Sequence, residues 1–267
     1  ETVAGANIVI KDTDGLTSTT TVAIYTDGCS NLTFDNLDVS KSGARSGAGL
    51  SLKNSSGTMT VQNCNVQNRG QGINAIGNAS WTVNNNDLLN SGDASSFSGA
   101  LNFISVTTGT IAAADNIFGG TALVGLRLIS CSNKIIGDET VAGANIVIKD
   151  TDGLTSVPTF FAIYTDGCSN LTFDNLDLSK SGAKSGTGLH LKNSTGTMTV
   201  QNCKIDNRAI GLNLADGTTT NTLISCNIIT GCTTGISTSG THTGNSIINN
   251  FFLGNTNSIA QSGTALV

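Results

Sequence analysis

Short runs of alternating hydrophobic and polar residues recur along the whole chain. Residues 31–39, 58–66 and 81–88 share one pattern, in which two alternating apolar residues precede a polar residue and an Asn. A second alternating run follows in each row, as in residues 49–52 and 188–191. Alternation with a period of two predicts half-buried strands, and the abundance of Gly, Asn, Thr and Ser disfavours long helices. The pattern therefore predicts an all-β fold of stacked turns of short strands, a β-solenoid.

When the rows are aligned, one column holds only Asn, Asp or Ser. A buried side-chain amide at a tight bend can donate to one neighbouring turn and accept from the other, so stacked amides satisfy one another. We therefore expect a ladder of stacked polar side chains at this bend; the alternative is that Asn merely favours turns. The residues of the column are Asn36, Asn63, Asn85, Asp115, Asp138, Asn175, Asn202, Ser225 and Asn250.

A much longer repeat is superimposed on these rows. Residues 1–18 recur letter for letter as residues 139–156. This self-similarity indicates two tandem copies of a repeat of about 138 residues, copy one over residues 1–138 and copy two over residues 139–267. No linker separates the copies, so residues 1–267 are expected to form one continuous domain of about ten coils.

The rows resemble the parallel β-helix repeats of the pectin-lyase-like superfamily. The phrases at residues 29–37 and 245–255 carry this resemblance. It implies a single-stranded right-handed parallel β-helix with an Asn ladder at a bend between strands. Right-handedness also agrees with the general preference of parallel crossover connections. The resemblance specifies the fold and leaves the function open, because this fold carries lyases, hydrolases, adhesins and structural fibres.

Charge and hydropathy narrow the classes of partner. Only 12% of the residues are charged, and the net charge is −5. An acidic chain is a poor partner for nucleic acid, which requires basic patches. The sequence has no long apolar run, so no membrane-spanning helix is predicted. As a repetitive protein of the surface or fibre type, the chain is expected outside the cell or at the cell surface.

The chain has seven Cys and two His. An odd number of Cys without Cys-x-x-Cys spacing argues against a zinc site and against a closed disulfide framework. Most Cys keep the register of the rows, which favours small core residues. Cys131 with Cys168, and Cys203 with Cys226, fall on neighbouring coils, where a disulfide is the alternative. Neither His lies in a pattern typical of a general base, and no catalytic residue is predicted.

One group of carboxylates is a candidate metal site. Asp12 and Asp14, repeated as Asp150 and Asp152, resemble the opening of a calcium-binding loop. They lack the remaining spaced ligands and the terminal Glu of such a loop, and a solvated turn is the alternative. Apart from this Ca²⁺ candidate, no cofactor is expected.

A second group consists of outward Asp residues near the predicted ladder, with an Arg one coil later. Pectate lyases of the superfamily use outward Asp residues to hold Ca²⁺ and an Arg or Lys as the base. Their motifs do not carry over residue by residue, and the duplication would create two nearly identical sites. The protein is therefore expected not to be an enzyme, with polysaccharide lyase-like activity as the runner-up. The residues of this runner-up are Asp35, Asp38 and Arg69, or Asp174, Asp177 and Arg208.

Outward Thr residues form a further column. Flat Thr arrays on solenoids can bind ice, whereas exposed β-branched residues are also favoured in any strand. The column is interrupted at Ala112 and Ile135, which makes ice binding the third function considered. The Thr residues are Thr33, Thr60, Thr82, Thr172, Thr199 and Thr222.

The two ends of the sequence suggest a mode of assembly. Glu1 begins partway into a coil, and residues 265–267 read as the opening of a further coil. Open ends of a solenoid expose unpaired backbone and apolar core, a template for another chain. We therefore expect a structural or adhesive protein that stacks head to tail into filaments, or forms part of a longer fibre. A β-helix that acts on or binds polysaccharide or cell-surface glycan is the alternative. The expected interface residues are Val3, Ile8, Ala265, Leu266 and Val267.

Overall fold

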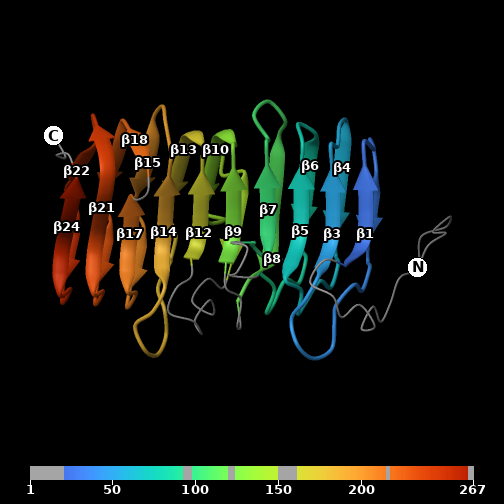
Figure 1. Ribbon diagram of the computed structural model, residues 1–267, viewed down its shortest axis with the longest axis horizontal. Coiled ribbons are helices and arrows are strands. Elements are labelled where there is room, and N and C mark those ends of the chain that lie inside the picture. The colour runs from blue at the N-terminus through green and yellow to red at the C-terminus, as the bar shows by residue number, and fades with distance from the viewer. Residues whose placement is uncertain (1–20, 93–97, 120–123, 150–160, 215–216, 264–267) are drawn as a thin grey trace.

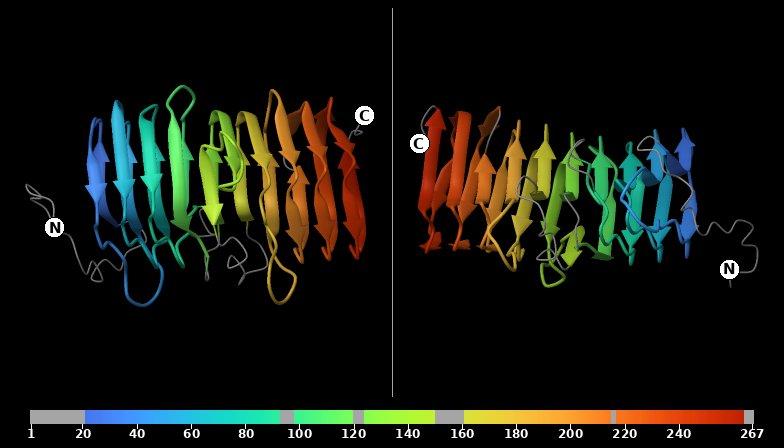
Figure 2. Two further views of the ribbon diagram at one scale, coloured as in Figure 1. Left: turned by 180° about the vertical axis from the view of Figure 1, so that it is seen from behind. Right: turned by 60° about the horizontal axis from the view of Figure 1, so that its bottom comes forward.

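The computed structural model describes residues 21–92, 98–119, 124–149, 161–214 and 217–263. All regular secondary structure in this part of the chain is β, and the strands pair in parallel. They stack into a rod, with β1 (Val22–Asp27) at one end and β24 (Asn257–Gly263) at the other (Figures 1 and 2). The rod makes about nine turns, and β24 opens the next. The prediction of an all-β parallel solenoid is thereby confirmed.

Sheet 1 faces the viewer in Figure 1 and receives one strand from each turn. A short additional strand, β18 (Thr218–Thr220), pairs with the far end of the long strand β21. The other strands of sheet 1 are β1, β3 (Ala48–Lys53), β5 (Gln71–Ile76), β7 (Leu101–Ile104), β9 (Val124–Ile129), β12 (Phe161–Asp166), β14 (Thr187–Lys192), β17 (Ile210–Leu214), β21 (Thr234–Thr243) and β24.

Sheet 2 lies behind sheet 1, and a small sheet 3 completes the last turns (Figure 2). Isolated bridges such as Asp38 with Asn65 take the place of sheet 3 in the earlier turns. Sheet 2 contains β2 (Thr33–Asp35), β4 (Thr58–Gln62), β6 (Ser80–Asn84), β8 (Ile111–Ile117), β11 (Ile146–Lys149), β10 (Ser132–Gly137), β13 (Ser169–Asp174), β15 (Met198–Gln201), β19 (Thr222–Ser225) and β22 (Ser246–Ile248). Sheet 3 contains β16 (Lys204–Asp206), β20 (Ile228–Thr230) and β23 (Phe251–Leu253).

One extra strand interrupts the regular order of sheet 2. β11 follows β10 in the chain, yet it lies between β8 and β10 and pairs with both. The chain turns back after β10, where the Val141 N–H donates to the Asp138 carbonyl at 3.2 Å. The Asn145 N–H then donates to the Ile135 carbonyl at 3.0 Å. The chain thus adds a strand to sheet 2 between two turns of the solenoid.

Columns of apolar side chains run along the inside of the rod. Leu50, Ile73, Leu101 and Leu126 are register partners in successive strands of sheet 1, and none is more than 1% exposed. Alternation within each strand places these residues inside and their neighbours on the other face. Burying each such side chain contributes roughly 1.5–3 kcal/mol. The buried apolar residues form one cluster along the rod.

The bend after most strands of sheet 2 is made by a residue in the left-handed conformation. Its φ lies between 54° and 57°, a region that Asn and Asp tolerate better than most residues. The bend residues are Asn36, Asn63, Asn85, Asp115, Asn175, Asn202, Cys226 and Asn249.

The predicted polar column coincides with this bend, but its side chains point outward into solvent. The left-handed bend turns the side chain of the bend residue outward and that of the next residue inward. The prediction of a buried side chain is therefore wrong at Asn36, Asn63, Asn85, Asp115, Asn175 and Asn202, all of which are exposed. Asp138 accepts a hydrogen bond from exposed Asn175 at 2.7 Å. In the later turns the bends fall at Cys226 and Asn249. Ser225 therefore precedes its bend, whereas Asn250 follows its bend and accepts from the Asn227 Nδ2 at 2.9 Å, as the predicted ladder requires.

The buried amides lie one residue after the bends. Asn86 and Asn116 are fully buried, and the Asn86 Nδ2 donates to the Asn116 Oδ1 at 2.9 Å. The Asn86 side chain also accepts from the Cys64 N–H at 3.0 Å and donates to the Val61 carbonyl at 3.0 Å. The second copy repeats this geometry with Asn227, Asn250, Cys203 and Val200.

Candidate functional site

Sheet 1 presents a continuous row of side chains on the face opposite the core columns. The strand register places one residue of each turn beside the corresponding residue of the next turn. Successive turns are about 4.8 Å apart, so the row is a linear array along the rod. Its members are Tyr25, Ser51, Asn74, Asn102, Arg127, Tyr164, His190, Asn213, Ser237 and Ala260.

The two copies of the repeat diverge on this outer face. Residues 21–64 and 160–203 are otherwise nearly identical, and only a few positions differ. Three of the differing positions are neighbours on the outer face of sheet 1, because β12 and β14 pair in register there. The corresponding residues are Val22 and Phe161, Ala48 and Thr187, and Ser51 and His190.

In the second copy these residues form a packed aromatic cluster. The rings of Tyr164 and His190 stack with centroids 5.2 Å apart and an interplanar angle of 16°. Phe161 meets the His190 ring edge-on at 4.7 Å, and the Asn213 Nδ2 lies 3.2 Å from the His190 Nδ1. Tyr164 is 7% exposed and His190 is 4% exposed, so this cluster stabilises the face and offers little ring surface to a ligand.

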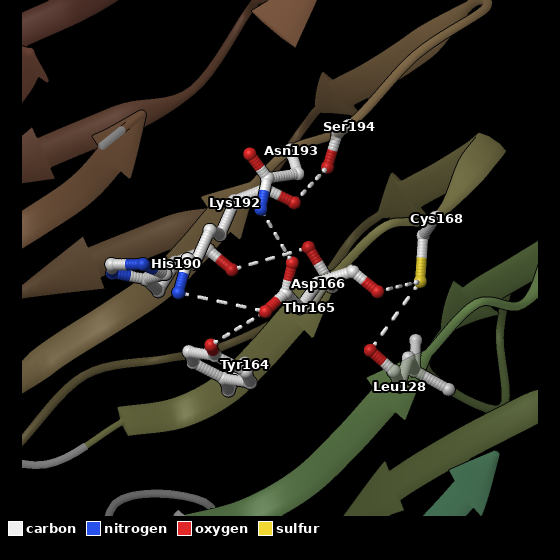
Figure 3. A network of polar contacts seen from close by, with 9 residues as sticks. All are labelled: Leu128, Tyr164, Thr165, Asp166, Cys168, His190, Lys192, Asn193 and Ser194. Carbon is white, nitrogen blue, oxygen red and sulfur yellow. Dashed lines mark hydrogen bonds and ion pairs between the residues drawn. The ribbon is translucent and has the colours of Figure 1, made fainter. Parts of the chain in front are cut away.

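Asp166 connects this cluster to the next turn, as Figure 3 shows. It accepts hydrogen bonds from the Tyr164 hydroxyl at 3.3 Å and from the Asn193 Nδ2 at 2.9 Å. Its other close partner is the Lys192 ammonium at 3.6 Å. Both charged side chains are about one-third exposed, and such an ion pair contributes only about 0–1 kcal/mol.

The first copy leaves the equivalent tyrosine open. Tyr25 is 53% exposed, and its hydroxyl donates to Asp27 at 3.0 Å. The Asn54 side chain donates to the same carboxylate at 2.7 Å, and this bond, with that from Tyr25, holds the pKa of Asp27 below its ordinary value. The Lys53 ammonium lies 5.5 Å from the centre of the Tyr25 ring. An exposed aromatic ring is therefore bordered by a carboxylate, an amide and an ammonium.

The structure places the two arginines of the lyase-like candidate inside the rod. Arg69 is 0% exposed and Arg208 is 1% exposed. The Arg69 Nε donates to the Val39 carbonyl at 2.7 Å, and the Arg208 Nε donates to the Leu178 carbonyl at 2.8 Å. Neither Arg is therefore placed to act as a base at the outer surface, because each buried guanidinium donates to backbone carbonyls of the preceding turn.

The Asp carboxylates of the lyase-like candidate accept hydrogen bonds from neighbouring side chains and backbone N–H groups. Asp35 accepts from Gln62 at 3.1 Å and from Asn63 at 2.7 Å, which links two turns. Asp38 accepts from the Ser40 N–H at 3.0 Å, so this bond is local and joins residues two apart in the sequence. In the second copy, Asp174 accepts from Gln201 and Asn202, and Asp177 accepts from Ser179 and Lys204.

The predicted Thr column is shorter than the sequence suggests. Thr33, Thr60 and Thr82 are register partners, and the next position is Ala112. In the second copy Thr199 pairs with Leu223, while Thr222 pairs with buried Met198 and is itself buried. The inclusion of Thr222 in the outward column is therefore wrong.

The described cysteines are free thiols. Cys131 and Cys168 lie on adjacent turns and are buried, and their thiols donate to the Phe103 and Leu128 carbonyls, each at 3.3 Å. The interaction between the two thiols lowers the pKa of Cys131 and raises the pKa of Cys168. Cys203 and Cys226 do not form a comparable pair, because Cys203 is buried and Cys226 is exposed at a bend. Burial raises the pKa of Cys203 to about 12.

Several predicted residues lie outside the described part of the chain. They are the calcium candidates Asp12, Asp14, Asp150 and Asp152, and the interface candidates Val3, Ile8, Ala265, Leu266 and Val267.

Among the described residues, no three or more His, Cys, Asp or Glu side chains gather where they could hold a metal ion. His190 belongs to the aromatic cluster described above. His242 is buried on another turn, with its Nδ1 2.6 Å from the Thr219 hydroxyl. Burial lowers the pKa of His242.

A family model described as "Periplasmic copper-binding protein (NosD)" matches residues 102–266. This segment is more than half of the chain. The chain belongs to the NosD family. The match agrees with the observed solenoid, which is consistent with the right-handed parallel β-helix of the pectin-lyase-like superfamily. No curated protein matches the chain. In the described residues, no helix is long and apolar enough to cross a membrane.

The copper named for the NosD family can be compared with the donors of this chain. A copper centre with three or four His, Cys or carboxylate ligands does not fit the described residues, which lack such a group. Soft sulfur donors that suit the monovalent ion occur side by side at Cys131 and Cys168.

Proposed function

We propose that this NosD-family chain is a non-catalytic structural solenoid that stacks head to tail into an extracellular filament or adhesive fibre. The observation that carries the proposal is the exposed core of the last described turn. Ile259 continues the inward column of its register partner Ile236. It is nevertheless 45% exposed, whereas Ile236 is fully buried. Ile247 and Phe252, in the turn below, are also only partly buried.

The first described turn offers the complementary surface. Ile24, Phe34 and Leu37 pack against the core but remain partly exposed. β1 and β12 have the same sequence after their first residue, and β12 pairs with β9 of the preceding turn. The corresponding edge of β1 can therefore accept a preceding turn of the same solenoid.

The proposed occupant of these end faces is a second copy of the chain. Each apolar side chain that becomes covered contributes roughly 1.5–3 kcal/mol, and pairing of β24 with β1 of the next copy would extend sheet 1. The contact joins two unlike surfaces, so it propagates into a filament and does not close into a dimer. The periplasmic description of the family supports a location outside the cytoplasm, and a cell-surface location is part of the proposal.

Ile259→Asp tests the stacking proposal. A carboxylate in the end face must lose water when the next copy docks, so we expect folded chains that no longer form filaments. Leu253→Asp is the matched control, because Leu253 is 62% exposed and does not continue a core column. Light scattering and electron microscopy measure assembly, and circular dichroism verifies the β fold. The proposal is contradicted if the Ile259→Asp chain assembles like the unmodified chain.

A second candidate function is glycan binding at the first copy's outer face. The exposed Tyr25 ring, bordered by Asp27, Asn54 and Lys53, combines an apolar surface with hydrogen-bonding groups, as a sugar ring requires. We expect Tyr25→Ala to weaken binding of an acidic polysaccharide in calorimetry by about tenfold, equivalent to about 1.4 kcal/mol. Thr33→Ala, on exposed sheet 2, should leave it unchanged. Equal binding by both variants would exclude this surface.

A further inference from the structure

A polar network replaces apolar packing inside one corner of the last turns. In the first copy, the inward register partners at this corner are Met59 and Trp81, both at most 1% exposed. In the second copy, the register partner of Met198 is Thr222, which is equally buried. The network lies where the chain passes from sheet 1 to sheet 2, between β21 and β22, close to β18 in Figure 1.

Three buried side chains make up this network, which we call the His242 corner: Thr219, His242 and Asn245, none more than 3% exposed. Thr219 and His242 are register partners in β18 and β21, and the Thr219 hydroxyl lies 2.6 Å from the His242 Nδ1. The Asn245 Nδ2 donates to the same hydroxyl at 3.1 Å, and the Asn245 Oδ1 accepts from the Thr222 N–H at 2.8 Å. The network therefore ties the connection between β21 and β22 to the preceding turn.

The direction of these hydrogen bonds determines the charge of His242. An amide nitrogen can only donate, so the Thr219 oxygen accepts from Asn245 and its own proton is available for the His242 Nδ1. The Nδ1 is then an acceptor, which requires a neutral imidazole with its proton on Nε2. That Nε2 is buried and has no hydrogen-bond partner among the described residues. A second proton would place a charge in a buried site and turn the Nδ1 into a donor.

The described side chains around His242 offer no charge that could stabilise an imidazolium. Thr219 of β18 and Asn245 beyond β21 are uncharged. Ser194, on the turn before β18, is uncharged and fully buried, and its carbonyl accepts from the Thr220 N–H at 3.2 Å. No charged side chain of the described residues contributes to the pKa of His242, which burial lowers and the Ser239 backbone raises in part.

We propose that the His242 corner is an acid-sensitive latch, which holds the β21–β22 connection against the preceding turn at neutral pH and opens on acidification. The open form takes up a proton at the ordinary pKa of about 6.5, whereas the closed form resists it. The latch is therefore fully stable above this pH and loses stability as the pH falls below it. Opening frees β22, which carries Ile247 of the proposed end face. An effect on stacking rests on the proposed function, whereas the latch itself is a property of a single chain.

Hydrogen exchange, followed by mass spectrometry of peptides that cover residues 217–222 and 241–246, measures opening of the latch. The two His are the only side chains whose ordinary pKa lies between pH 5 and pH 7.5. After correction for the intrinsic exchange rate, we expect opening to be up to about thirtyfold more frequent at pH 5 than at pH 7.5. His242→Gln, which is uncharged at every pH, should remove this dependence, whereas the matched control His190→Gln should retain it.

Nuclear magnetic resonance of the imidazole nitrogens in the unmodified chain needs no variant to fold. We expect the His242 Nδ1 to be unprotonated at pH 7, and the ring to remain neutral below the ordinary pKa of about 6.5. A His242 ring that takes up its second proton at the ordinary pKa would overturn the proposal. So would opening that is equally frequent at both pH values, or a pH dependence that persists in His242→Gln. Single rods in dilute solution suffice for each measurement, so the outcome is independent of whether the chain forms filaments.

Discussion

Arg208→Met is expected to lower the free energy of unfolding by about 3 kcal/mol or more. The buried guanidinium donates to two successive carbonyls of the preceding turn, those of Leu178 at 2.8 Å and Ser179 at 3.1 Å. Methionine preserves the apolar stem but removes every donor, so buried carbonyls lose their partners. Arg69→Met should have a similar effect, because the first copy repeats the arrangement with Val39 and Ser40. Urea unfolding followed by circular dichroism measures the change.

Two further variants separate this structural role from a catalytic one. Arg208→Lys should also be destabilised, since a single ammonium cannot reproduce the planar fork that contacts both carbonyls. Lys204→Met removes an exposed ion pair with Asp177 and should cost less than about 1 kcal/mol. An Arg208→Met chain that is as stable as the unmodified chain, but loses cleavage of an acidic polysaccharide, would contradict the structural account and support lyase-like activity.

Asn86→Ala is expected to lower the free energy of unfolding by about 3 kcal/mol. The fully buried amide makes hydrogen bonds to Cys64, Val61 and Asn116 on neighbouring turns. Alanine removes the partner of the buried Cys64 N–H and a donor to the Val61 carbonyl, while the Asn116 Oδ1 keeps only the backbone N–H of residue 86 at 3.2 Å. Asn227→Ala should reproduce the effect in the second copy, where the same three contacts occur.

Asn85→Gly is the matched control for Asn86→Ala. Asn85 is the adjacent exposed bend residue, with a φ of 54° that glycine adopts without strain. Its side chain makes one exposed hydrogen bond, to Asn63 at 2.7 Å. We expect a loss below about 1 kcal/mol. If the Asn85 variant were the less stable of the two, the polar column predicted from the sequence would be the structural one after all.

The fold follows from the sequence because the alternation and the tandem copies are so regular. The register of the buried amides, in contrast, does not follow from the sequence. Residues 84–86 are all Asn, and residues 249–250 are both Asn, so composition cannot show which residue of each run points inward. A strand alternates with a period of two only up to the left-handed bend, where the side-chain direction changes. The column predicted from spacing therefore falls one residue too early in most turns.

Buried charges were the other feature that the pattern could not reveal. Arg69, Arg208 and Lys134 look like surface residues, because charged side chains are rarely buried. Each donates to backbone carbonyls of another turn, and such acceptors leave no sequence signal. Likewise, β11 has the apolar alternation of any strand, and nothing in its sequence shows that it inserts between β8 and β10.

In the proposed filament, the turns of one copy continue into those of the next. Electron microscopy of the unmodified chain over a concentration series measures this stacking as particle length. About nine turns at about 4.8 Å correspond to a rod roughly 45 Å long. We expect particles of constant width whose length grows well beyond this value as concentration rises. Particles that keep the length of a single rod at every concentration would contradict it.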